Sequence, residues 1–170
     1  MSNVIFTPRL TIPSNTDLRW IKTTYGGYNH CILGSPSYGT GSVLANCTGY
    51  CWGRWLELLD ATTCQLSTGN GANWYGHSDS YERGLTPRLG AIACWGTGAG
   101  HVAVVEEITS TYIKCSESGW ENYYFRTTDY DLNMTKSGHV FQGFIYLPIT
   151  FLTIEELVAI IKRRRRYGDL

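Results

Sequence analysis

The first regular alternation of apolar and polar positions along this 170-residue chain begins at Asn46. From Cys47 to Asp60, apolar side chains recur at a spacing close to one face of an α-helix. Asn46 is a favourable N-cap for such a helix, although Gly49 and Gly53 lower the helical propensity of the segment. The pattern therefore predicts a helix that starts at Cys47.

Later in the chain the hydrophobic period changes from that of a helix to that of strands. Segments rich in β-branched and aromatic residues are separated by short turns, and they cover residues 89–95, 101–108, 112–117, 123–127 and 139–146. Strands this close in sequence form an antiparallel sheet. Residues 1–45 and 61–88 have the composition of loops. We therefore predict an α+β domain with N-terminal helices packed on an antiparallel sheet of about five to six strands.

This domain is predicted to end after Pro148 and to cover residues 1–149. Residues 150–170 form a basic tail, in which the pattern of 154–166 predicts a short helix. The run Lys162–Arg166 within it is a candidate contact for an anionic polymer or a membrane surface. A solvated helix face explains the run equally well.

Composition and charge exclude several classes of protein. With 43% hydrophobic residues the chain is expected to fold rather than to remain disordered. Its formal net charge of zero does not provide the basic face of a nucleic-acid-binding domain, so we expect no nucleic-acid partner. No signal peptide is visible, and no apolar run reaches the roughly 18 residues of a membrane-spanning helix. We therefore expect synthesis in a cytoplasm and no integral membrane segment.

The six cysteines are expected to be reduced. A chain of this length does not need disulfides to fold, and the expected cytoplasmic synthesis disfavours them. Cys47 and Cys51 are four residues apart, but no second pair has the spacing of zinc ligands, and the four histidines are scattered. We expect neither a metal site nor a cofactor.

One of these cysteines occupies a position where a thiol becomes reactive. The nucleophilic form is the thiolate, and the start of a helix favours that negative charge. Cys47 directly follows the predicted N-cap, whereas the other five cysteines lie inside the helix, within strands or in irregular stretches. A lone cysteine is more often a small buried hydrophobe, but its position makes Cys47 the candidate nucleophile.

The candidate base is His101, which opens an apolar strand directly after a glycine-rich loop. The other histidines, His30, His77 and His139, do not open a strand beside such a loop and suit surface or loop positions. A dyad of this kind also needs a group that orients the imidazole.

Glu117 is the candidate for this third role. If the two strands pair through a three-residue loop at 109–111, His101 and Glu117 become diagonal neighbours on one face, roughly 7 Å apart between backbones. A two-residue loop would instead place them on opposite faces of the sheet. An ordinary surface carboxylate is an equally good interpretation of Glu117.

These segments resemble the motifs of one known family. Residues 46–55, Asn-Cys-Thr-Gly-Tyr-Cys-Trp-Gly-Arg-Trp, are similar to the catalytic helix of CHAP-domain peptidoglycan hydrolases, in which an Asn-Cys or Gln-Cys pair opens the helix. Residues 100–106 resemble the histidine motif of the family, and 116–120 occupy the place of its third catalytic residue. The neighbouring strands at 86–95 and 141–148 are also similar, so the resemblance covers about residues 20–148.

The resemblance implies a papain-like fold and hydrolysis of an amide bond in the bacterial cell wall. Members of the family act as N-acetylmuramoyl-L-alanine amidases or as endopeptidases of the stem peptide or cross-bridge. Many are bacteriophage endolysins or tail-associated lysins. It follows that peptidoglycan is the expected partner of a monomeric enzyme that is made in the host cytoplasm and acts at the wall after release. The basic tail is then a candidate contact for anionic wall polymers.

The chain departs from the family pattern in two places. Some relatives have Asn in or just after the third motif, whereas here Asn122 lies five residues beyond Glu117, so we keep it as an orienting candidate. Some relatives also carry an acidic calcium loop before the cysteine, but residues 20–46 contain no Asp or Glu. Asn46 is a candidate donor to the oxyanion, although we expect it to act as the helix cap.

Tryptophan side chains are candidates for lining a substrate groove, because their faces suit sugar rings and extended peptides. The candidates are Trp52, Trp74, Trp95 and Trp120, although core packing is the commoner role for each.

Two other functions remain open from the sequence. The same dyad serves a cysteine amidohydrolase or transferase that acts on an amide outside the wall. A cell-wall-binding module without catalysis would also use the aromatic residues, but the positions of Cys47 and His101 would then be coincidental.

Overall fold

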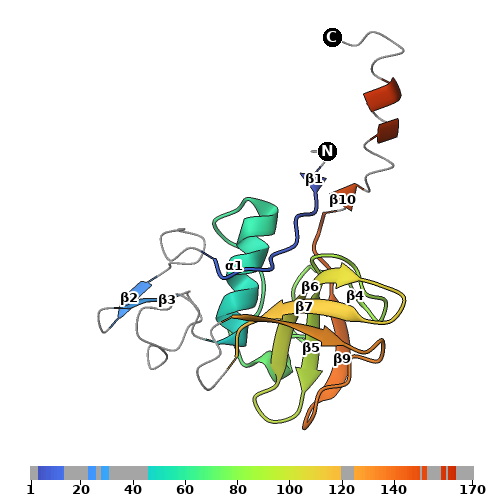
Figure 1. The fold of residues 1–170 in the computed structure, drawn as a ribbon. Coiled ribbons are helices and arrows are strands. Elements are labelled where there is room, and N and C mark those ends of the chain that lie inside the picture. The colour runs from blue at the N-terminus through green and yellow to red at the C-terminus, as the bar shows by residue number, and fades with distance from the viewer. Residues whose placement is uncertain are drawn as a thin grey trace.

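The computed structural model describes residues 4–13, 23–25, 28–30, 46–119, 125–149, 151–152, 158–159 and 161–163. Figure 1 shows the helix α1 (Cys47–Leu59) beside a curved sheet. A short 3-10 helix, η1 (Gly71–Asn73), follows it in the chain. The strands are β1 (Val4–Ile5), β2 (Thr23–Tyr25), β3 (Tyr28–His30), β4 (Arg83–Gly84), β5 (Ile92–Gly96), β6 (His101–Ile108), β7 (Ile113–Glu117), β8 (Arg126–Tyr130), β9 (Val140–Ile145) and β10 (Phe151–Leu152).

The main sheet has six strands in the order β4-β9-β5-β6-β7-β8, and all of its neighbours are antiparallel. Such a sheet with one covering helix is compatible with the predicted α+β class. Of the predicted N-terminal helices, the described residues contain α1, and most of residues 14–45 lie outside the described residues. The strands also do not form a simple meander, because β9 returns across the sheet to pair with β5. The sequence missed β4, since a strand of two residues carries no periodic pattern.

Alternation along β5 and β6 divides the core into two layers. Val102 and Val104 pack with the helix residues Tyr50 and Trp55 on one face of the sheet. Ala103 and Val105 belong to a second cluster on the other face, together with Trp95, Ile113 and Tyr130. Because successive side chains of a strand point to opposite faces, β6 is buried on both sides over most of its length.

A buried ion pair joins α1 to β6. The guanidinium of Arg54 donates two hydrogen bonds, each of 2.9 Å, to the carboxylate of Glu106, whose residue is only 1% exposed. Ser116 donates to the same carboxylate at 2.6 Å and accepts from Tyr50 at 2.6 Å. A buried charge is tolerated only when it is paired and its remaining polar atoms are satisfied, and this network satisfies both partners.

The same network holds the N-terminal segment on the domain. The backbone N–H of Arg9 donates to Glu106 at 2.9 Å, and Arg54 donates to the carbonyl of Thr7 at 2.7 Å. The side chain of Arg9 also pairs with Glu57 of α1. Residues 7–9 therefore lie against the helix through charged hydrogen bonds.

Beyond residue 149, β10 pairs with β1 in parallel, and the two strands lie next to each other in Figure 1. Phe151 packs edge to face on Phe6, with 4.8 Å between ring centroids. Residues 151–152, which the sequence assigns to the tail, thus contact the N-terminal segment. Residues 158–159 and 161–163 have helical backbone within the helix predicted over 154–166.

The loop between β5 and β6 is held by a close contact with η1. Gly100 has φ +71°, and a side-chain Cβ at this position would lie 2.1 Å from the backbone nitrogen of Ala72 and 2.6 Å from the carbonyl of Trp95. The N–H of Ala72 donates to the carbonyl of Ala99 at 3.0 Å. Only glycine provides both the left-handed backbone and the space for this approach, which determines where β6 begins.

The substitution Arg54→Met tests the buried ion pair. It leaves the carboxylate of Glu106 buried without its cation, so we expect the free energy of unfolding to fall by about 3–5 kcal/mol. Denaturant unfolding followed by circular dichroism measures this change. Glu82→Gln is the matched control, because Glu82 pairs with Arg88 on the surface, where both side chains are more than half exposed. That variant should lose less than about 1 kcal/mol. Equal losses in the two variants would contradict the interpretation.

A second pair of variants tests the glycine contact. Gly100→Ala should destabilise the fold by about 3 kcal/mol or more, because strain at a positive φ is added to a collision with Ala72. In Gly98→Ala the added Cβ has φ +59° but meets nothing within 4 Å, so only the backbone strain of about 1–2 kcal/mol applies. The two thermal melts should therefore differ, and similar losses would show that η1 does not constrain the loop.

Candidate functional site

Asn46 and Cys47 form the start of α1, as the sequence predicted. The Asn46 side-chain oxygen accepts from the backbone N–H of Gly49 at 2.8 Å and from the hydroxyl of Thr48 at 2.7 Å. The helix cap is therefore confirmed, and the oxygen is occupied by it. Cys47 is the first residue of the helix, and its side chain is partly exposed.

The environment of Cys47 favours its thiolate. Burial raises the pKa of the Cys47 thiol, but a hydrogen bond with His101 and the charge of the imidazole lower the pKa by more. Backbone hydrogen bonds from Val102 and Thr48 act in the same direction, so the pKa lies below its usual value. Position at the helix start and contact with an imidazole thus combine as expected for a nucleophilic cysteine.

His101 is the first residue of β6, and its imidazole lies between the thiol of Cys47 and the carboxylate of Glu117. It is only 7% exposed, and its ring centroid lies 5.7 Å from that of Trp95, its partner on β5. Burial lowers the pKa of His101, but hydrogen bonds with Cys47 and Glu117, and their charges, raise it above the usual value. The imidazolium is therefore retained to a higher pH than in a free histidine.

Glu117 binds the other side of the imidazole. Its carboxylate is fully buried and forms a hydrogen bond with Nε2 of His101. With Nε2 held in this way, Nδ1 is the nitrogen left to exchange a proton with the thiol. Despite burial, hydrogen bonds and charges from His101 and from neighbouring cations hold the pKa of Glu117 far below its usual value. The carboxylate is therefore ionised throughout the neutral range.

The pairing of β6 with β7 brings His101 and Glu117 together. It differs from the predicted pairing at two points, and the two differences shift the register in opposite directions. Ile108 pairs with Ile113, so the loop is one residue longer than predicted. A bulge between Val105 and Glu107 then shifts the register by one residue, and Val104 pairs with Ser116. Continued by one residue, this register places Ala103 opposite Glu117, as the three-residue loop had implied.

Three cationic or titratable side chains at the site were missed by the sequence analysis. Arg126 of β8 donates to Glu117 at 2.7 Å, and Nζ of Lys136 lies 3.8 Å from the same carboxylate. His139 lies in the connection before β9, consistent with the loop position expected for it, and its ring centroid lies 6.4 Å from that of His101. Lys136 and His139 belong to the connection between β8 and β9, residues 131–139, which has no hydrophobic period from which its path could be predicted.

Three of the four tryptophan candidates for the substrate groove are buried. Trp52, Trp74 and Trp95 are at most 7% exposed, and their indole N–H groups donate to the backbone carbonyls of Ser67, Gly69 and Met134. These three are core residues rather than an open groove lining, because each ring is enclosed and its polar atom is satisfied. Trp120 and the orienting candidate Asn122 lie outside the described residues.

The remaining described thiols differ from Cys47. Cys47, Cys51, Cys94 and Cys115 are free thiols. Burial raises the pKa of Cys51, Cys94 and Cys115, and the nearby anionic groups raise the pKa of Cys51 and Cys115 further. These three thiols remain protonated at neutral pH. Among these cysteines, Cys47 is the one whose surroundings lower the pKa of the thiol.

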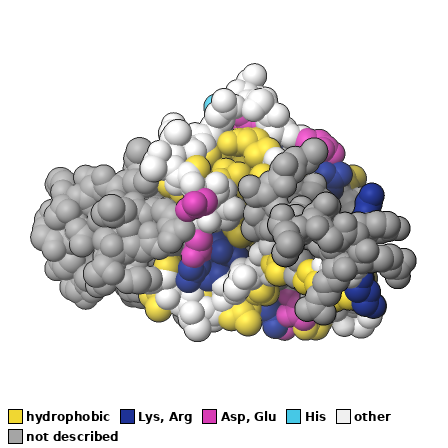
Figure 2. All heavy atoms as spheres, turned by 90° about the horizontal axis from the view of Figure 1, so that it is seen from above, with side chains coloured by type: hydrophobic (Ala, Val, Ile, Leu, Met, Phe, Trp, Pro, Cys, Tyr) yellow, Lys and Arg dark blue, Asp and Glu magenta, His cyan; other side chains and the backbone are white. Residues whose placement is uncertain are grey.

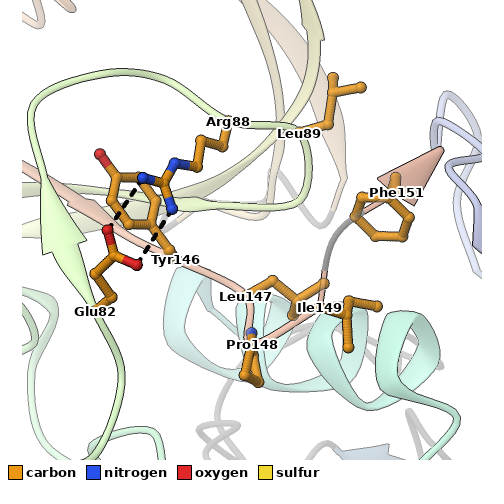
Figure 3. A pocket seen from close by; sticks show the side chains of 8 residues that line it. All are labelled: Glu82, Arg88, Leu89, Tyr146, Leu147, Pro148, Ile149 and Phe151. Carbon is orange, nitrogen blue, oxygen red and sulfur yellow. Dashed lines mark hydrogen bonds and ion pairs between the residues drawn. The ribbon is translucent and has the colours of Figure 1, made fainter. Parts of the chain in front are cut away.

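Two pockets among the described residues lie away from this site. Figure 3 shows the first, of about 460 Å³, where the guanidinium of Arg88 lies over the ring of Tyr146 at 3.8 Å and pairs with Glu82. Its other walls are apolar and come from Leu89, Leu147, Pro148, Ile149 and Phe151. The second, of about 380 Å³, lies between α1 and the N-terminal segment. Neither pocket is lined by Cys47 or His101.

Further features bear on possible ligands and partners. Among the residues that the structure describes, no three His, Cys, Asp or Glu side chains have the geometry of a metal site. Within the same residues, no helix is long and apolar enough to cross a bilayer. On the face shown in Figure 2, basic and acidic side chains lie next to one another between hydrophobic patches.

Residues 37–119 match the model of a known protein family, the CHAP domain. The matched segment includes Cys47 and His101 and ends two residues after Glu117. Proteins with this domain are generally cysteine-dependent hydrolases, and the domain suggests amidase or peptidase activity on peptidoglycan. Over residues 37–119 the chain is therefore similar to the CHAP domain, and this segment contains the cysteine–histidine contact at the helix start.

Proposed function

We propose that this protein hydrolyses an amide bond of bacterial peptidoglycan, as an N-acetylmuramoyl-L-alanine amidase or as an endopeptidase of the stem peptide or cross-bridge. The observation that carries the proposal is the continuous contact from the Cys47 thiol through His101 to the buried carboxylate of Glu117. Such a chain provides a nucleophile, a base and a group that orients the base.

In the first half of the reaction the Cys47 thiolate attacks the carbonyl carbon of the scissile amide. The C–N bond then breaks, the imidazolium of His101 gives its proton to the leaving amine, and a thioester to Cys47 remains. In the second half, neutral His101 takes a proton from water, which attacks the thioester. The carboxylic acid product leaves, and the thiolate–imidazolium pair is restored.

The tetrahedral intermediate needs hydrogen-bond donors for its oxyanion. We assign this role to the backbone N–H of Cys47, which belongs to the first turn of α1, where N–H groups lack helical partners. The Asn46 oxygen is an acceptor engaged in capping, so this atom does not serve the oxyanion.

A thiol at a helix start that meets an imidazole at a strand start is the arrangement of papain-like enzymes, and we propose that relationship for this domain. The catalytic unit then covers residues 1–149, and 150–170 form a tail whose basic run, Lys162–Arg166, contacts anionic wall polymers. The biological setting we propose is that of a monomeric phage lysin, made in the host cytoplasm and acting on the wall after release.

Cys47→Ala tests the nucleophile. Purified protein is incubated with Gram-positive cell walls, and the soluble fragments are analysed by mass spectrometry. The variant should release fragments at least about 1,000-fold more slowly than the wild type while keeping the same circular dichroism spectrum. Cys64→Ala, which removes a half-buried thiol outside the site, is the matched control and should retain activity.

The new termini on the fragments distinguish an amidase from an endopeptidase. Binding to walls without any release of fragments would instead favour a non-catalytic wall-binding module. If walls are neither bound nor cut, but small peptide amides are cleaved or transferred to amines in a Cys47-dependent way, the substrate lies outside the wall.

Glu117→Gln tests the orienting carboxylate. The amide carries no charge, so the pKa of His101 should fall, and the alkaline limb of the pH–rate profile should move to lower pH. We expect the maximal rate to drop about 100-fold or more, because the imidazole is no longer held as an imidazolium. Glu107→Gln removes an exposed carboxylate of β6 and should leave both rate and profile unchanged. An unaltered profile in Glu117→Gln would exclude this role.

A further inference from the structure

Lys136 is the least expected residue beside the proposed catalytic groups. Its ammonium donates to the hydroxyl of Tyr130 at 3.1 Å and lies 3.8 Å from Oε2 of Glu117, the oxygen that also binds His101. It stands 5.9 Å from the ring centroid of Trp95 and 5.6 Å from that of Tyr130. The side chain is only 16% exposed, although lysine is among the residues most rarely buried.

The charged and titratable groups around Glu117 and His101 come from every neighbouring element. They are Cys47 and Cys51 of α1, Cys115 of β7, Arg126 and Tyr130 of β8, and Lys136 and His139 of the following connection. Glu117 is the anion of this group, and Arg126 and Lys136 are cations within reach of it. The pair of Cys47 and His101 has no net charge in either of its proton arrangements. The site therefore contains one more positive than negative charge.

We propose that Lys136 is a positioning residue, which together with Arg126 shares the carboxylate of Glu117 and thereby limits how strongly Glu117 holds the proton of His101. The inference rests on the proposed roles of Cys47 and His101. Its geometric basis is that imidazole and ammonium approach the same carboxylate oxygen, while Arg126 and Thr128 bind the other oxygen at 2.7 and 2.5 Å.

When Glu117 is shared between His101 and the two cations, His101 can act both as base and as acid in the reaction. A buried carboxylate that faced only the imidazolium would raise its pKa so far that it became a poor acid for the leaving amine. The positive charge of Lys136 lowers the pKa of His101, because it repels the imidazolium. It also lowers the pKa of Cys47, because it attracts the thiolate. Burial lowers the pKa of Lys136, and attraction to Glu117 and Cys47 offsets only part of this effect, so the pKa lies below its usual value. The positive charge of Lys136 is therefore stabilised by Glu117 and Cys47, the same groups whose protonation it influences.

Lys136→Met is the decisive variant, because it keeps the length of the side chain and removes the charge. Loss of the cation should raise the pKa of both Cys47 and His101. The acid limb of the pH–rate profile, set by Cys47, and the alkaline limb, set by His101, should therefore both move to higher pH by roughly one unit. This direction is opposite to the alkaline-limb shift expected for Glu117→Gln. Lys136→Arg retains the charge and should restore the wild-type limbs.

The measurement is the rate of alkylation of Cys47 by iodoacetamide in the full chain as a function of pH, followed by mass spectrometry of the Cys47 peptide. It needs no substrate, so it tests Lys136 even if walls are not hydrolysed, and the wall assay on the same samples tests the proposed function separately. Lys114→Met is the matched control, since it removes a lysine that pairs with Glu107 and Asp129 at 3.5 Å.

A purely structural role for Lys136 would lower the melting temperature and leave the alkylation limbs in place. That outcome would overturn the proposal, as would equal shifts in Lys114→Met or no recovery in Lys136→Arg. An upward shift in Lys136→Met alone, with recovery in Lys136→Arg, supports it.

Discussion

The buried carboxylate of Glu117 imposes the strongest constraint on this structure. A fully buried anion must be surrounded by donors and positive charge, and here they come from His101, Arg126, Thr128, Tyr130 and Lys136. These partners lie on three elements, β6, β8 and the connection that follows β8. The hydrogen bonds and ion pairs of the Glu117 carboxylate therefore hold these three elements in fixed positions relative to one another. They also orient the imidazole of His101.

A second buried carboxylate, Glu106, performs a comparable function on the helix face of the sheet. Ser116 and Glu117 are adjacent in β7, yet Ser116 joins the network of Arg54 and Glu106 while Glu117 binds His101. Alternation along one strand thus links two polar networks on opposite faces. One network holds the helix whose first residue is Cys47, and the other holds the imidazole. The contact between thiol and imidazole depends on both.

Much of this architecture could be predicted from sequence because it follows from periodic patterns and from caps. The helix start at Asn46 and the strand that begins at His101 have strong local signals and were located correctly. The facing of His101 and Glu117 was anticipated with a loop one residue too short, and the bulge compensated for the error. A bulge has no signature in a single sequence, since it depends on how two strands meet. Lys136 lies on an irregular connection, where no period indicates which way a side chain points.

The contrast between Cys47 and Cys51 shows which physical factors make a thiol reactive. They lie one turn apart on the same helix, and burial raises the pKa of each of them. Cys51 has only negative or neutral neighbours, so its pKa rises further and it remains a core residue. Cys47 adds the backbone N–H groups of Thr48 and Val102 and the imidazole of His101, and these reverse the effect of burial. In the proposed mechanism the Cys47 thiol becomes a nucleophile through donors and a charge that Cys51 lacks. The role proposed for Lys136 follows the same principle, because a side chain that alters this local charge acts on the chemistry without touching the substrate.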